Sequence, residues 1–277
     1  MSSLGLHRFH WLTLAACATM LIIVLMALAA PLIAPHSPIL MNPGQRLQPM
    51  SAEHLLGTDA LGRDLFSRIV YGARVSLMVG AGAALGALIF GLPIGLISGY
   101  FRMLDPFIMR VMDGMMAIPG ILFAVALIAL VEPSVPTVII AITIPEIPLV
   151  VRLVRARLLS AREEPFVEAA VTMGGTPFSI LVRHLLPATV APLTIQLTYV
   201  FAAAILIESA LSFLGIGIGA ETPTWGNIMA SGRLYFAINP WMILWPALVL
   251  TLCLLSINII GDALRDLLDP QHKKRGA

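Results

Sequence analysis

Long apolar stretches with little or no charge limit the fold of this 277-residue chain more than any other feature. A helix needs about 20 apolar residues to cross the hydrocarbon core of a bilayer. Only 12% of the residues are charged, against about 25% in a typical soluble domain. We therefore predict an all-α membrane protein with six transmembrane helices. They cover residues 11–34, 75–101, 108–131, 136–154, 188–213 and 234–261, and the last crosses from about Trp241.

The positions of Lys and Arg predict which side of the membrane each connection faces. Cytoplasmic segments carry an excess of these residues, and 12 of the 17 lie on one side if the N-terminus is placed inside. We therefore expect residues 1–10, the loop 155–187 and the tail 262–277 to be cytoplasmic. Residues 35–74 are expected to be periplasmic, ending in a short interfacial helix over 64–73, where apolar residues recur at helical spacing.

Several functions conflict with the composition. The lysines are Lys273 and Lys274 alone, and no G-x-x-x-x-G-K-[ST] motif is present, so the chain has no loop of the usual kind for binding ATP phosphates. Cys17 and Cys253 lie in separate apolar runs outside any C-x-x-C motif, which argues against a disulfide framework or a metal knuckle. A net charge of +2 gives no basic field for nucleic acid. We expect no cofactor in this chain.

The cytoplasmic loop 155–187 predicts two short helices joined at a sharp corner. Pro165 suits the first turn of a helix, and Gly174 suits a left-handed C-terminal position. Thr176 followed by proline restarts a helix as its N-cap, and that helix is expected to stop at Pro187. The corner is expected to expose three apolar side chains, those of Phe178, Ile180 and Leu181.

This loop also carries a family resemblance. Glu168-Ala169-Ala170, three residues, Gly174, nine residues and then His184-Leu185-Leu186-Pro187 resembles the EAA loop of binding-protein-dependent ABC importer permeases. The family commonly has an apolar residue at the position of His184. The resemblance implies that the loop inserts into a groove of an ATPase subunit. The residues implied in this coupling share that loop: Glu168, Ala169, Ala170, Gly174, Thr176, Pro177, Phe178, His184 and Pro187.

Three further motifs extend the resemblance. Residues 54–68, residues 212–226 and residues 258–270 are similar to the second permease of dipeptide, oligopeptide and nickel importers. This implies a type I ABC importer (MetI-like) core over residues 75–261, in the bacterial inner membrane. It also implies a second, related permease, two ATPase subunits that bind ATP and Mg, and a periplasmic binding protein. Peptides are the expected solute, with nickel chelates, opines and glutathione-type peptides as alternatives.

Two carboxylates inside predicted spans are candidates for the solute pathway, since charge within a bilayer is costly and commonly functional. Glu146 lies between Pro145 and Pro148. Glu208 lies toward the outer end of its span, where we expect water to reach it. An ion-coupled secondary transporter using both is an alternative function. A membrane enzyme with His184 as its base is another, although no G-x-S-x-G or H-E-x-x-H motif accompanies it.

The remaining charged residues near the spans are expected to be structural. Asp113 lies one helical turn from Arg110, and we predict an ion pair between them. Arg63, Asp64 and Arg68 are expected to organise the segment before the second span through local hydrogen bonds and ion pairs.

Overall fold

The computed structural model of the protein describes residues 3–268 and shows a bundle of helices. The helical elements, in chain order, are α1 (Ser3–Leu28), α2 (Ala30–Ile33), η1 (Pro43–Gln45), α3 (Leu65–Tyr100), α4 (Asp105–Met116), α5 (Gly120–Leu130), α6 (Val135–Arg162), α7 (Pro165–Thr172), α8 (Pro177–Ile180), η2 (Leu181–Leu185), α9 (Leu186–Phe213), α10 (Trp225–Gly232), η3 (Arg233–Tyr235) and α11 (Trp241–Leu268).

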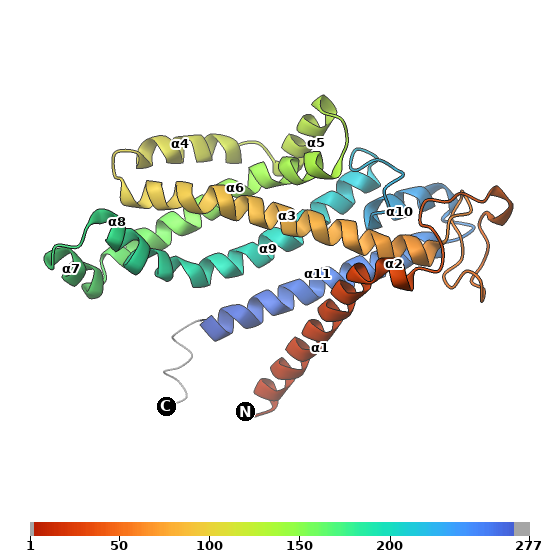
Figure 1. Cartoon of the computed structure of the whole chain (residues 1–277), viewed down its shortest axis with the longest axis horizontal. Helices are drawn as coiled ribbons and strands as arrows, with labels where there is room; N and C mark the ends of the chain where they lie inside the picture. Colours follow the sequence, from red (N-terminus) through yellow and green to blue (C-terminus); the bar gives the residue numbers. More distant parts are fainter. Residues whose placement is uncertain (1–2, 269–277) are drawn as a thin grey trace.

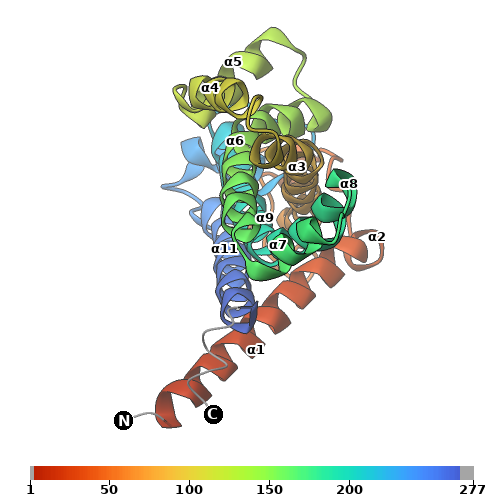
Figure 2. The same ribbon diagram turned by 90° about the vertical axis from the view of Figure 1, so that its left-hand side faces the viewer.

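Three long helices, α3, α6 and α9, pack against one another along the long axis of the molecule (Figure 1). α11 packs on α9, and α1 packs on α11 and α3. α7 and α8 lie at one end of the bundle, and α2, α10 and the loops around them lie at the other (Figure 1). We call these the α7 end and the α10 end. Figure 2 views the molecule from the α7 end, with α4 and α5 on one side and α1 on the other.

Glycines spaced four residues apart bring α3 and α6 into close contact. A Cβ atom added at Gly91, Gly95 or Gly99 would lie 2.7 Å from a side-chain atom of α6. Small residues at this spacing let two backbones approach closely in a membrane. The two helices therefore form a tightly packed pair that connects the two ends of the molecule.

Five described helices are long and apolar enough to cross a membrane, and a bent pair would make six. The bent pair is α4 and α5, whose axes differ by 81°. The sequence prediction of one continuous span over 108–131 is therefore wrong. Pro119 lies at the break, and a proline disfavours helical backbone at the residue before it, so the helix ends at Met116 and restarts at Gly120.

Other predicted boundaries shift because helices continue past the apolar runs. The expected interfacial helix over 64–73 is the first part of the 36-residue α3 and not a separate element. α6 runs to Arg162, so the first eight residues of the predicted loop 155–187 are helix. The expected start at Trp241 is confirmed, and α11 continues to Leu268. Residues 269–277 of the predicted tail lie outside the described part.

A buried polar network holds the α10 end. Asp59 accepts hydrogen bonds from the backbone N–H of Arg63, at 2.9 Å, and from its Nε, at 2.7 Å. Arg68, whose side chain is completely buried, donates to the carbonyl of Pro38 at 3.0 Å. Asp64 caps α3 by accepting from the backbone N–H of Ser67 at 2.8 Å. The expected organising role of the three charged residues is therefore confirmed.

Candidate functional site: the corner between α7 and α8

The chain reverses direction between α7 and α8 through a hydrogen-bonded glycine turn. Gly174 has φ +81°, a backbone conformation that glycine adopts without steric cost. Its N–H bonds to the carbonyl of Val171 at 2.9 Å, and the N–H of Gly175 bonds to the carbonyl of Ala170 at 3.0 Å. This pair of bonds is the Schellman motif, which ends a helix and satisfies its last carbonyls. The corner therefore has a defined geometry.

The second helix of the corner begins as the sequence predicts. The hydroxyl of Thr176 accepts from the backbone N–H of Ser179 at 3.3 Å, and Pro177 takes the first helical position. The predicted stop at Pro187 is wrong, because α8 continues through η2 into α9. In the π-helical turn before it, the N–H of Leu186 bonds to the carbonyl of Leu181. In an ordinary α-helical turn, a proline ring clashes with the carbonyl four residues earlier. The wider π-helical turn, with its hydrogen bond across five residues, accommodates Pro187.

One face of the corner is anchored to the bundle. Val167, Ala170 and Ile180 are buried against the last turns of α6 and the end of α3. The expected exposure of Ile180 is therefore wrong, because it packs beneath α7. The corner therefore shares one buried apolar cluster with the ends of α3 and α6.

The opposite face of the corner is apolar and uncovered. Met173 is 82% exposed and Phe178 75%. Large apolar side chains gathered on a surface commonly mark an interaction site. The sequence predicts exposure for Phe178 but not for Met173.

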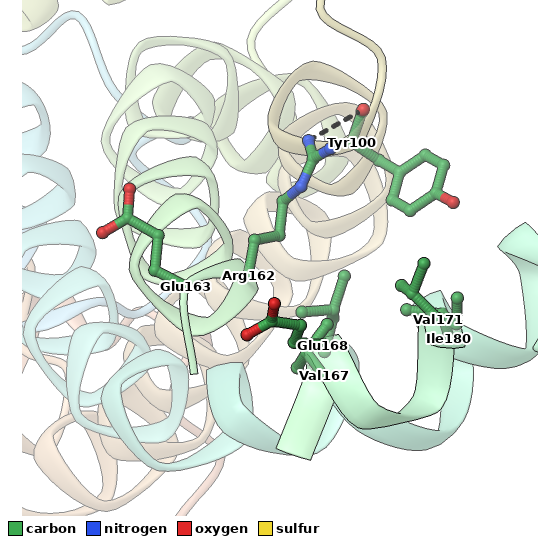
Figure 3. A pocket seen from close by; sticks show the side chains of 8 residues that line it. Tyr100, Arg162, Glu163, Val167, Glu168, Val171 and Ile180 are labelled. Atoms are coloured by element: carbon green, nitrogen blue, oxygen red, sulfur yellow. Dashed lines mark hydrogen bonds between the residues drawn. The ribbon is translucent and has the colours of Figure 1, made fainter. Parts of the chain in front are cut away.

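A cavity of about 390 Å³ lies between the corner and the bundle, and Glu168 is among its lining residues (Figure 3). Arg162 also lines it and donates to the carbonyls of Gly99 and Tyr100, at 3.0 and 3.1 Å. Its guanidinium lies 5.4 Å from the centre of the Tyr100 ring. Arg162 therefore caps the end of α3 and ties it to the end of α6, directly above α7.

The remaining predicted coupling residues divide by exposure. Ala170 is buried and His184 is half-buried, with its ring stacked on Phe166 at 6.4 Å between centroids. The others are exposed: Glu168, Ala169, Gly174, Thr176, Pro177, Phe178 and Pro187. The structure thus brings all nine to one compact corner or its immediate continuation into α9.

Two ion pairs that the sequence did not predict lie toward the same end. Arg155 donates to Asp105 through Nη2 at 2.6 Å, and Arg152 donates to Asp113. The expected pairing of Asp113 with Arg110 is wrong, because α4 lies beside α6 and presents Asp113 to an arginine there. A sequence signal for these contacts does exist: two acidic residues lie in one predicted span region and two arginines lie near the end of the next.

The two embedded carboxylates occupy different environments. Glu146 is half-buried in the middle of α6, and its carboxylate forms no hydrogen bond or ion pair with a side chain among the described residues. Glu208 is completely buried and accepts hydrogen bonds from Ser212 at 2.8 Å and Ser76 at 3.3 Å. The expectation that water reaches Glu208 is wrong, because serines from α3 and α9 enclose it.

These features define a polytopic helical membrane protein. It has a buried polar network at the α10 end and an exposed apolar corner between α7 and α8. The chain belongs to the family of binding-protein-dependent transport system inner membrane components, whose model matches residues 91–274. A second model, for the N-terminal TM domain of oligopeptide transport permease C, matches residues 8–49. The chain is therefore a multi-pass permease subunit of the inner membrane and not an enzyme.

Individual relatives agree with this family. A probable peptide ABC transporter permease protein of Sinorhizobium fredii is 48% identical, over 91% of this chain and 86% of that protein. A dipeptide transport system permease protein of Alkalihalophilus pseudofirmus is 47% identical, over 90% and 83%. A chain of the MetNI methionine ABC transporter, in an inward-facing conformation, matches with a TM-score of 0.62 at 21% identity, over 74% of this chain and 98% of that one. The predicted MetI-like fold is confirmed.

Proposed function

We propose that this chain forms one half of the membrane path of an ATP-driven importer of peptides, dipeptides among them. The other half is a second, related permease. Two ATPase subunits bind ATP and Mg, and a periplasmic binding protein delivers the solute. The relatives named as peptide permeases, at 47–48% identity over most of the chain, support peptides as the solute class.

The observation that carries this proposal is the corner between α7 and α8. Its outer face exposes Met173 and Phe178, and such apolar surface is stabilised when a partner covers it. Its inner face packs on the ends of α3 and α6. We infer that an ATPase groove covers the corner, so that movement of the ATPase is passed to the tightly packed pair of α3 and α6. Glu168 and Gly174 set the shape of the corner.

If the α7–α8 corner contacts the ATPase subunits, the orientation of the chain in the membrane and the limits of its segments follow. The excess of Lys and Arg favours a cytoplasmic α7 end, with residues 1–10 and 262–277 on that side as well. The segment 35–64 and the start of α3 are then periplasmic. We place the coupling loop at residues 163–185, between the end of α6 and the start of α9, within a transmembrane core over 75–261.

Glu146 is our candidate for the solute path. A half-buried carboxylate without a partner in its own chain is available to a cationic group, and a peptide ammonium is one. We do not assign Glu208 to the path, since its carboxylate is already enclosed by serines of this chain.

Variants of Gly174 test the coupling role directly. A Cβ atom at this position would meet nothing within 4 Å, so a substitution acts through backbone conformation alone. Gly174→Val places a β-branched residue in the left-handed region, at a cost of about 1–2 kcal/mol. Gly174→Asn is the matched control, because asparagine tolerates that region. Peptide uptake and co-purification of the ATPase subunits should fall for Gly174→Val and be largely retained for Gly174→Asn.

Two results would contradict the proposal. The first is unchanged uptake in Gly174→Val cells that contain normal amounts of the complex. The second is uptake that disappears when the proton gradient collapses while ATP is maintained, which would favour the ion-coupled alternative.

A further inference from the structure

Three side chains with metal-binding atoms meet at the α10 end, away from the α7–α8 corner. They are His36, from the segment after α2, His54, from the loop before α3, and Asp64, the N-cap of α3. Their ligand atoms lie within 4.8 Å of one another. Residues 18 and 10 positions apart in the sequence are brought together here by the fold alone.

The distances between these atoms are close to those of a metal site. Oδ1 of Asp64 lies 2.9 Å from Nδ1 of His54 and 3.9 Å from Nδ1 of His36. Ligands bonded to a tetrahedral zinc ion at its usual bond lengths lie about 3.3 Å from each other. The widest separation, up to 4.8 Å, would have to shorten by about 1.5 Å to match this spacing, so a rotation of the half-exposed His36 side chain is needed to place all three atoms around one ion.

The outer contacts of the three side chains are those that metal ligands require. Nε2 of His54 lies 3.3 Å from Oε1 of Gln45, an oxygen that can accept a hydrogen bond from the imidazole N–H. Oδ2 of Asp64 accepts from the N–H and the hydroxyl of Ser67, at 2.8 and 2.7 Å. Hydrogen bonds of this kind orient ligating imidazoles and carboxylates in metal sites. Nδ1 of His54 and Oδ1 of Asp64 share a hydrogen bond of 2.9 Å, which a metal ion bound to both atoms would replace.

Two observations on bonding and charge favour a cation at this cluster. Nδ1 of His36 is shielded from solvent and has no hydrogen-bond partner among the described residues. Asp64 forms no ion pair with Arg or Lys within residues 11–268, whereas neighbouring Asp59 pairs with Arg63 and lies 3.7 Å from Arg68. The carboxylate of Asp64 therefore lacks the counter-charge that its neighbour has.

We propose that His36, His54 and Asp64 bind a zinc ion. Two imidazole nitrogens and one carboxylate oxygen are ligands that Zn²⁺ favours, with water at the fourth position. The side chain of His36 is 38% exposed, which provides an entry path, while those of His54 and Asp64 are buried. The ion would join the segment after α2 to the first turn of α3 and hold the α10 end closed.

Zinc content of the purified protein tests this inference. The full-length chain, with the subunits that co-purify, is stripped with a chelator and dialysed against Zn²⁺, and bound zinc is counted per chain by mass spectrometry. We expect His36→Phe, which keeps the packing of one ring against the other, and Asp64→Asn, which keeps an oxygen for the N-cap, to bind one zinc fewer per chain. Their affinity at this site should fall by at least about tenfold.

The control variant is His184→Phe, which removes a histidine at the opposite end and should leave the zinc content unchanged. Substitution of Co²⁺ for Zn²⁺ gives a second readout, since the visible absorption of tetrahedral Co²⁺ should be lost in His36→Phe but retained in His184→Phe. Gel filtration and thermal unfolding establish that the variants are folded. Equal zinc content in the wild type, His36→Phe and Asp64→Asn would overturn the proposal, as would a wild-type chain that binds no zinc.

Discussion

The two ends of this molecule differ in the charged side chains that they bury. At the α10 end, Asp59, Arg68 and Asp64 are each at most 2% exposed and bonded within the chain. At the α7 end, Met173 and Phe178 are 82% and 75% exposed. The α10 end buries charged groups that would otherwise be hydrated. The α7 end exposes apolar surface, whose contact with water is unfavourable. The α10 end therefore contains a buried charged network, although it too exposes large apolar side chains, Leu32 at 89% and Leu234 at 90% among them.

This difference separates stability from coupling. Changes in the buried polar network should act on folding, because a buried charge without its partner is costly. Changes on the exposed corner should act on assembly and transport, because few contacts within the chain are lost there. The three substitutions below are ordered by their expected effect on folding stability.

The largest effect is expected for Asp59→Ala. This change leaves the guanidinium groups of Arg63 and Arg68 buried without their shared carboxylate, which should lower the free energy of unfolding by about 3–5 kcal/mol. The measurement is thermal unfolding of the purified chain in detergent, with Glu53→Ala, an exposed carboxylate in the same segment, as the control. Adding Arg68→Met should restore part of the loss. A decrease no larger than that of Glu53→Ala would show that the network does not hold this end together.

Phe178→Ser should produce the reverse pattern. The side chain is 75% exposed, so its loss should change the free energy of unfolding by no more than about 0.5 kcal/mol. Removing a large apolar anchor from a docking surface should lower both ATPase co-purification and uptake. Met103→Ser is the matched control, because Met103 is 93% exposed between α3 and α4 and lies outside the corner. Equal loss of co-purification in both variants would mean that the corner is not a specific docking surface.

Glu146→Gln should have the smallest effect on folding, since Glu146 has no partner to lose among the described residues. It lies midway along α6, between the two ends. If its carboxylate meets the ammonium group of a peptide, uptake should fall by about tenfold, corresponding to about 1.4 kcal/mol. Transport assays with Glu53→Gln as the control measure this. Normal uptake by Glu146→Gln would remove the residue from the solute path.

Sequence patterns predicted local features at the corner well. Proline at 165 and 177, threonine at 176 and glycine at 174 each have strong positional preferences within one or two helical turns. The Schellman turn and the N-cap of α8 follow from those preferences, and both are present. The failure at Pro187 is also informative, because one π-helical turn was enough to carry the helix past a proline.

Contacts between distant residues were not predictable in the same way. The sequence predicts an ion pair between Asp113 and the arginine one turn away, but Asp113 bonds to Arg152, 39 positions further along the chain. Glu208 was expected to be wet because of its depth in a span, whereas serines of α3 and α9 enclose it. In both cases the partner depends on which helices lie side by side, and no local pattern specifies that.

By itself the sequence determined that this chain is a bundle of membrane helices with a short glycine corner, because apolar length and turn chemistry act over neighbouring residues. Only the tertiary structure decided which face of that corner is covered, which carboxylate is enclosed, and that His36, His54 and Asp64 share one centre. Those outcomes depend on the packing of helices far apart in the chain, where close approach and burial select the partner of each side chain.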